Sequence, residues 1–327
     1  MIPPITIRAV GDIMLGSTYP DRSDMPPNNG KDILTKVSPL LKDADITFGN
    51  LEGPLVDGGT TSKRGPNSYA FRTPPTYGQY LKDAGFDVLS VANNHANDFG
   101  ERGRTTTCKT LEKLGIEHAG SDRDDVAELT IRGTRVAVVA FAHNQVSLNV
   151  NNIGAAKQAV SAAAKQADIV IVSFHGGAEG TAHQHVPRGP ERFFGESRGD
   201  LRRFTHAVID AGADLVLGHG PHVVRGLEIY RDRLIAYSLG NFATYGKFGL
   251  RGETALSLIL EVSLAPRGAK TPGMFVSGKI HPVVQVGKGI PQPDPTRKTI
   301  AVARKLSDTD FGKTAPRIAP DGVLMPR

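Results

Sequence analysis

Seven stretches of this chain are apolar and strand-like, and each of them ends abruptly in polar residues. Continuous apolar runs are typical of parallel strands that are buried on both faces of a sheet. In open α/β sheets, ligands bind just beyond the carboxyl ends of such strands. Six of the seven ends carry side chains that can hold a metal ion or move a proton. We therefore expect side chains that are far apart in the sequence to meet in one site.

The polar residues at these ends are of only a few chemical types. Asp, Glu, Asn and His predominate, and the seven ends lie at Gly11-Asp12, Asn50–Glu52, Asn93–His95, His143-Asn144, His175–Gly177, His219–His222 and Asn241. Burying three polar residues in a row, as at 93–95, costs several kcal/mol unless each is paired, which favours a functional interpretation there. The purely structural alternatives are a turn at Asp12 and a helix-terminal charge at Glu52.

Helical periodicity falls between the apolar runs. It predicts helices at 31–43, 77–85, 101–115, 154–168 and 198–212. Strands that alternate with helices indicate an α/β fold with a largely parallel sheet and helices outside it. After about residue 230 the pattern changes, and 255–264 and 274–286 are predicted to be strands without helices between them, in an antiparallel part of the same architecture.

The C-terminal part of the chain is rich in proline. Residues 287–298 are predicted to form an extended surface loop. We expect one domain over 1–290, followed by a Pro-rich C-terminal extension over 291–327 that is appended to it. Gly- and Pro-rich loops at 17–31 and 57–68 follow candidate ligand strands, so we expect them either to wall a pocket or to be simple connecting loops.

Composition excludes several classes of protein. The single cysteine, Cys108, rules out a disulfide framework and a Cys-rich zinc site, and its helix-like surroundings favour a structural role over a nucleophile. The net charge of +6 slightly favours anionic partners, but the basic residues are dispersed and no specific nucleic-acid motif is present. No run approaches the roughly 20 apolar residues of a membrane span, so no transmembrane segment is expected. The expected location is the cell envelope or periplasm if a targeting segment has been removed, and otherwise the cytoplasm.

The histidines divide into two groups. His175 follows an apolar run and precedes two glycines. His219 and His222 are separated by a Gly-Pro turn, which can hold the two imidazoles so that both bind one metal ion. His95 is placed to donate a proton. The remaining histidines are assigned to loops or structural positions, with His143 as an outside candidate; they are His118, His143, His183, His185, His206 and His281.

Oxygen and imidazole ligands without thiolates suit a hydrolytic site for divalent metal ions. Two ions about 3.5–4 Å apart, bridged by one carboxylate, would activate water and bind an anionic oxygen. Among the carboxylates at the strand ends, Glu52 is the one that we place between the ions.

Six motifs, in order, resemble the CapA family of poly-γ-glutamate capsule synthesis proteins. They are GDIMLG, GNLEGPL, ANNHANDFG, SFHGGAEG, GADLVLGHGPHVV and IAYSLGNF, and together they cover about residues 5–245. That family resembles a branch of the calcineurin-like metallophosphoesterases. The resemblance implies a single-domain β-sandwich flanked by helices on both outer faces, in the layer order αββα, with ligands on the loops after the strands.

The resemblance also implies a role for each candidate residue. One metal ion, Mn, Zn or Fe, would be held by Asp12, Glu52 and His222. A second would be held by Glu52, Asn94, His175 and His219. His95 would act as the general acid, with Asn94 beside it. Four more residues are expected to support these ligands or to contact the substrate: Asn50, Asn93, Asp98 and Asn241.

Four features depart from the superfamily pattern. Met14 stands where a ligand histidine is usual, and Glu52 replaces the usual bridging aspartate. One more residue than usual separates His219 from His222. The run Gly176–Gly180 lacks the Trp and the acidic-aromatic pair of CapA relatives. The first three changes weaken one metal site more than the other, and the fourth concerns the substrate pocket.

Two functions remain open. The first is a metal-dependent hydrolase that uses metal-activated water on a phosphoester or amide bond in capsule or poly-γ-glutamate metabolism, acting on an anionic small molecule or polymer. The second is a non-catalytic accessory protein that binds the anionic polymer or a capsule synthase complex. A nucleotide-binding transferase and a serine hydrolase are disfavoured because neither a P-loop, nor G-x-G-x-x-G after a strand, nor a G-x-S-x-G elbow occurs.

Overall fold

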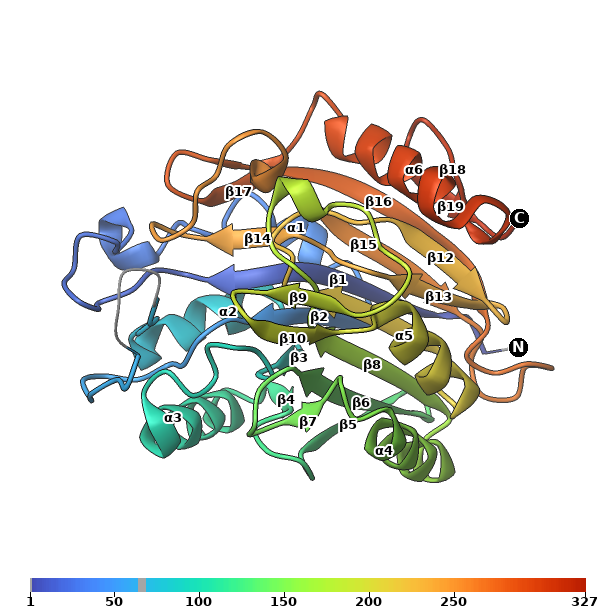
Figure 1. Ribbon diagram of the computed structural model, residues 1–327, viewed down its shortest axis with the longest axis horizontal. Helices are drawn as coiled ribbons and strands as arrows, with labels where there is room; N and C mark the ends of the chain where they lie inside the picture. Colours follow the sequence, from blue (N-terminus) through green and yellow to red (C-terminus); the bar gives the residue numbers. More distant parts are fainter. Residues whose placement is uncertain (1, 64–68) are drawn as a thin grey trace.

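The computed structural model describes residues 2–63 and 69–327, so residues 64–68 of the loop expected at 57–68 lie outside the described residues. Two large sheets form the centre of the structure (Figure 1). The first sheet runs in the order β18-β19-β16-β15-β1-β2-β3-β4, with β14 beside β1 and β17 beside β16. Its strands are β1 (Ile5–Met14), β2 (Ile46–Leu51), β3 (Val88–Ser90), β4 (Glu117–Ala119), β14 (Asn241–Thr244), β15 (Leu256–Leu264), β16 (Phe275–Val286), β17 (Ile290–Pro293), β18 (Arg317–Ile318) and β19 (Val323–Met325).

The second sheet runs in the order β12-β13-β11-β8-β6-β5, with β7 beside β6. Its strands are β5 (Val126–Ile131), β6 (Thr134–Ala142), β7 (Leu148–Asn149), β8 (Ile169–His175), β11 (Leu215–His219), β12 (Leu227–Tyr230) and β13 (Arg233–Ala236). A separate hairpin, β9 (Glu191–Phe193) and β10 (Glu196–Gly199), lies in front of the sheets in Figure 1.

The two sheets pack face to face, and alternation along each strand explains why. On β6, Val136 and Val138 belong to the core between the sheets, whereas Ala137 and Val139 face the outer helices. This αββα layering confirms the predicted fold class.

Four of the five predicted helices are present, and they cover the outer faces of the sheets. They are α2 (Gly78–Ala84) and α3 (Gly100–Lys113) on the first sheet, and α4 (Ile153–Gln166) and α5 (Leu201–Asp210) on the second. The predicted helix at 31–43 is wrong for most of its length. Turns occupy 31–37 and only α1 (Ser38–Leu41) is helical, because Pro39 has no N–H to donate and permits a helix only at its start.

The strand pairing is mixed rather than largely parallel. β1 to β4 pair in parallel, as do β6, β8, β11 and β13. As predicted, β15 and β16 are antiparallel to one another, and β15 is also antiparallel to β1. Within the described ranges, no helix combines the length and the hydropathy that crossing a membrane requires.

The expectation of an appended C-terminal extension is corrected by the structure. Residues 298–311 form helix α6, which buries Ile300 and Ala303 in the core between the sheets, and β19 pairs with β16. The prolines of this region flank the helix rather than interrupt it. The Pro-rich composition of this region masked the amphipathic pattern of the helix in the sequence. Because α6 and β19 pack onto the rest of the fold, the chain is one domain through to its last strands.

Leu324→Ala is therefore expected to destabilise the protein by about 2–5 kcal/mol, because Leu324 is fully buried in the core between the sheets. Met325→Ala is the matched control. The Met325 side chain, next to Leu324 in the sequence, is 45% exposed, so this substitution should change the stability little. Denaturant unfolding of both variants measures the difference. Equal, small effects would show that these residues are an appendage after all.

Candidate metal centre

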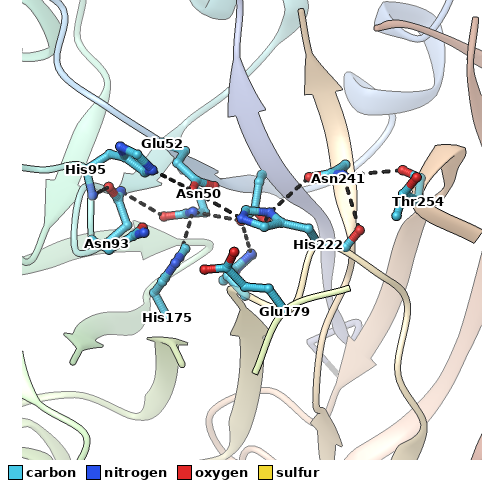
Figure 2. A network of polar contacts seen from close by, with 12 residues as sticks. Asn50, Glu52, Asn93, His95, His175, Glu179, His222, Asn241 and Thr254 are labelled. Atoms are coloured by element: carbon cyan, nitrogen blue, oxygen red, sulfur yellow. Dashed lines mark hydrogen bonds and ion pairs between the residues drawn. The ribbon is translucent and has the colours of Figure 1, made fainter. Parts of the chain in front are cut away.

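The strand register brings the predicted polar residues together. Asp12 on β1 lies opposite Asn50 on β2 and opposite Asn241 on β14. In the other sheet, His175 on β8 lies opposite His219 on β11. Because these strands end at the same edge of the sandwich, their terminal side chains converge in one site, which Figure 2 shows.

Asp12, Glu52 and His222 form the tightest cluster, and one ligand atom from each lies within 4.8 Å of the others. The His222 Nδ1 atom is 2.9 Å from Asp12 Oδ2 and 3.0 Å from Asn241 Oδ1, so it donates to both. The His222 Nε2 atom lies 3.7 Å from Glu52 Oε1. His222 adopts a φ of 57°, a strained conformation for a residue other than glycine, and Asn241 Nδ2 donates to its carbonyl at 3.1 Å.

His175 and His219 lie on the other side of Asp12, and both are buried. Asn50 Nδ2 donates to Asp12 Oδ1 at 2.8 Å and is 3.5 Å from His175 Nδ1. His219 Nδ1 is also 3.5 Å from Asp12 Oδ1, which is an electrostatic contact but too long for a good hydrogen bond. Asn50 thus orients the aspartate between the two imidazoles.

Six polar atoms of the predicted ligand residues are buried and have no hydrogen-bond partner in the described part of the chain. They are both carboxylate oxygens of Glu52, Asn94 Oδ1, His175 Nε2 and both ring nitrogens of His219. Each such atom costs about 1–3 kcal/mol in a protein without a ligand. Each of them can offer a lone pair to a divalent cation, except that a neutral His219 offers only one of its two ring nitrogens at a time. The residues present therefore fit a metal site.

Charge is distributed unevenly over the site. Burial and the neighbouring Asp12 raise the pKa of Glu52 well above its usual value. Burial would also raise the pKa of Asp12, but His219 and His222 more than offset this and hold it far below the normal range. Burial lowers the pKa of His175; at His222 burial acts in the same direction, but the attraction of Glu52 and Asp12 overcomes it and raises the pKa to about 10. Without a metal ion, the His222 imidazolium balances the buried carboxylates.

His95 lies at the edge of the cluster in a fixed orientation. Its Nδ1 atom is 2.8 Å from Asp98 Oδ2, and its ring stacks on Phe71 with 3.9 Å between the ring centroids. Asn93 Oδ1 accepts from the His95 backbone N–H at 3.1 Å. The opposite ring atom, Nε2, lies 3.9 Å from Glu52 Oε1, so it faces the site. Burial lowers the pKa of His95.

Four of the other histidines pair with carboxylates that are not among the predicted ligands, whereas His143 lies beside His175, with 5.8 Å between the ring centroids. His118 pairs with Asp125, His185 with Asp310, His206 with Glu228 and His281 with Glu261. His183 ends a short 3-10 helix, and His143 Nδ1 lies 3.2 Å from the His175 carbonyl oxygen. Met14 Sδ accepts from the Gly16 N–H at 3.3 Å, so its position supplies no imidazole.

Three residues beside the site carried no signal in the sequence. Lys63 Nζ lies 2.5 Å from Asp98 Oδ1 and 3.2 Å from His95 Nδ1. Phe71 supplies the stacking surface for His95. Glu179 points toward His222 in Figure 2. Only its place four residues after His175, in a Gly-rich run at a strand end, could have drawn attention to Glu179.

Two solved structures share this architecture. A hypothetical protein from Thermus thermophilus aligns with a TM-score of 0.51 at 17% identity, over 85% of this chain and 98% of that one. A proposed 5′-nucleotidase from Staphylococcus aureus, in complex with α-ketoglutarate, aligns with a TM-score of 0.50 at 13% identity, over 92% of this chain and 58% of that one. The facing sheets, with helices outside them, have a metallophosphoesterase-like fold.

The chain belongs to the family described as bacterial capsule synthesis protein PGA_cap, whose model matches residues 6–245. The capsule biosynthesis protein CapA of Bacillus anthracis is 30% identical over 260 residues, which are 73% of this chain and 59% of the relative. The PGA biosynthesis protein CapA of Bacillus subtilis is 30% identical over 254 residues, 71% and 61% of the two chains. A Mycobacterium tuberculosis protein named "probable polyglutamine synthesis accessory protein" is 29% identical over 228 residues, 60% and 55% of the two chains. The chain thus spans about three fifths of the length of these relatives.

Proposed function

We propose that this chain is a metal-dependent hydrolase that cleaves a phosphoester or an amide bond in capsule or poly-γ-glutamate metabolism. The observation that carries the proposal is that six buried polar atoms of the predicted ligands Glu52, Asn94, His175 and His219 have no hydrogen-bond partner among the described residues. Buried polar atoms are normally paired, so a group of unpaired ones points to a missing ligand, and Asp12, Glu52 and His222 bring ligand atoms within 4.8 Å of one another. Membership of a capsule synthesis family supports the metabolic context.

Two sets of residues would hold metal ions. Asp12, Glu52 and His222 are the set whose ligand atoms already lie close together. The second set consists of Glu52, Asn94, His175 and His219. These residues contain all six of the atoms without a hydrogen-bond partner among the described residues. When bound there, Mn, Zn or Fe would supply a reactive water at neutral pH and would stabilise negative charge on the substrate. The first set lacks an imidazole at position 14, so we propose that it binds its ion more weakly.

His95 is the proposed general acid. Asp98 accepts from its Nδ1–H and favours the imidazolium form, in which an Nε2–H facing the site would supply the proton that the leaving group needs. Lys63 and Asp98 pair with each other, so the charge of Asp98 is shared between two partners. Asn93 and the Phe71 ring restrict the imidazole to one orientation. These residues position a proton donor and exclude water from one side of it.

A non-catalytic accessory role is the second candidate, and the name of the Mycobacterium tuberculosis relative favours it. In that case the metal ion would be structural, and the chain would bind the anionic polymer or a capsule synthase. Polymer binding would then survive the loss of His95, without turnover of any ester or amide.

The test is elemental analysis of the purified protein, followed by assays with added Mn²⁺ on a phosphomonoester, a phosphodiester and a γ-glutamyl amide. We expect bound divalent metal and turnover of at least one class. The double variant His175→Ala/His222→Ala should lose both the metal and the activity. A natively folded wild-type protein that takes up no divalent ion after reconstitution would contradict the proposal.

A further inference from the structure

Glu179 brings a third carboxylate to the edge of the candidate metal centre. The loop that carries it is held by the backbone on both sides: Gly177 N–H donates to the Arg198 carbonyl at 2.7 Å, and Gly180 N–H donates to the Pro221 carbonyl at 2.9 Å. The Ala178 N–H donates to Glu191 Oε2 at 3.0 Å. Figure 2 shows the Glu179 carboxylate directed toward His222. The side chain is 21% exposed, so a substrate can reach it.

Arg198 determines how this carboxylate is turned. Its side chain is only 3% exposed, and Nη1 donates to Glu179 Oε1 at 2.7 Å while Nη2 lies 2.9 Å from Glu196 Oε2. Glu196 also lies 3.4 Å from His143 Nε2. With Oε1 engaged by the guanidinium, Glu179 Oε2 is the oxygen left to accept a hydrogen bond from a ligand.

Away from the metal ions, the side chains beside Glu179 disfavour a phosphate monoester dianion. The side-chain cations described beside the site are already paired: Arg198 with Glu179 and Glu196, Lys63 with Asp98, and His222 with Asp12. Glu179 adds a third carboxylate to those of Asp12 and Glu52, and therefore adds to the negative potential there. A phosphate oxygen placed next to Glu179 would be repelled. An N–H group there would be attracted and would satisfy the free oxygen.

We propose that Glu179 is a substrate-binding carboxylate that accepts a hydrogen bond from the N–H of the scissile amide. The substrates of this site are then amides rather than phosphoesters. The inference rests on the proposed hydrolase function and narrows it. Hydrolysis forms a C–O bond from water and breaks the C–N bond. The departing nitrogen takes one proton from His95 Nε2, and the attacking water releases two protons, of which one returns to His95 and the other converts the amine to an ammonium ion. Glu179 then stabilises the amine product as it becomes an ammonium ion.

The test uses a matched pair of ligands, a γ-glutamyl dipeptide and its depsipeptide analogue, in which an ester oxygen replaces the N–H. The variant is Glu179→Gln, whose amide oxygen will face Arg198 and whose NH₂ group will face the site, so that an acceptor becomes a donor. The ratio of kcat/KM for amide over ester should fall roughly tenfold to a hundredfold relative to wild type, because the hydrogen bond to a charged acceptor is lost. Metal content should be unchanged.

Glu196→Gln is the matched control, because Glu196 also pairs with Arg198 but its side chain is 55% exposed. It should leave the amide-to-ester ratio as in wild type. Equal losses for amide and ester in Glu179→Gln, or loss of bound metal, would overturn the inference, as would turnover of the phosphoesters alone.

Failure of the proposed function is distinguishable from failure of this inference. A wild-type protein that binds metal but turns over no substrate refutes the hydrolase. Calorimetric binding of the dipeptide and the depsipeptide then decides the role of Glu179. Tighter binding of the dipeptide by wild type, absent in Glu179→Gln, supports the N–H contact, and equal binding of both ligands overturns it.

Discussion

Glu52→Gln is expected to abolish metal binding and, at the same time, to raise the thermal stability of the metal-free protein. Both oxygens of Glu52 are buried without hydrogen-bond partners among the described residues, and the side chain lies in the same cluster as Asp12. A neutral amide removes the repulsion between the two carboxylates but is a poor bridging ligand. Addition of Mn²⁺ at about 100 times its Kd should stabilise wild type by about 2.7 kcal/mol and should leave the variant unchanged.

The pH dependence of this gain follows from the direction of the pKa shift. Burial and Asp12 raise the pKa of Glu52 in the folded protein above its ordinary value of 4.5. Above pH 4.5 the unfolded chain loses this proton while the folded protein keeps it, so the stability of the metal-free wild type falls as pH rises toward the folded-state pKa. The advantage of Glu52→Gln should therefore be absent below pH 4.5 and grow above it.

Glu191→Gln is the matched control, because Glu191 is a buried glutamate with a partner. Its carboxylate accepts from both Arg225 Nη1 at 2.9 Å and Nη2 at 2.7 Å, and Arg225 is fully buried. Removing this charge leaves the guanidinium uncompensated and should destabilise the protein by about 3–5 kcal/mol. Thermal melts in chelator, with and without metal, measure both variants. If Glu52→Gln also destabilised the metal-free protein, the buried carboxylate of Glu52 would not be a source of instability in the absence of metal, and this prediction would be wrong.

His95→Gln should lower kcat by about 10²–10⁴-fold while leaving the metal content unchanged. The imidazole faces the site through Nε2 and is held from behind by Asp98, an arrangement that delivers a proton to a leaving group. Glutamine keeps much of the volume against Phe71 but cannot serve as an acid at neutral pH. Steady-state kinetics and elemental analysis on the same preparation separate loss of the proton donor from loss of the metal.

His185→Gln is the control for this substitution, since His185 is largely exposed and pairs with Asp310 outside the site. It should leave kcat as in wild type. An unchanged kcat in His95→Gln would exclude His95 as the acid. Polymer binding that persists in His95→Gln, with no turnover by wild type, would instead support the accessory role.

Local sequence predicted most of the elements, and two failures show its limit. Apolar runs such as 169–175 are strands because only a sheet buried on both faces accommodates them. The region 31–43 reads as a helix by periodicity, but Pro39 confines the helix to one turn. Helix α6 was missed because its short apolar pattern is flanked by prolines, and its burial depends on the edge of the sandwich that it covers.

The sequence alone determined which side chains stand at the strand ends, because the apolar runs stop at Asp12, Asn50, His175 and His219. The tertiary structure decided which of them meet. Strand register sets Asp12 beside Asn50 and His175 beside His219, and the facing of the two sheets brings these pairs together. Glu179 owes its orientation to Arg198, 19 residues away. The sequence specifies which chemical groups are present. The distances between them are set only in the folded protein, where burial of both sheet faces fixes the strand register and the way the two sheets pack.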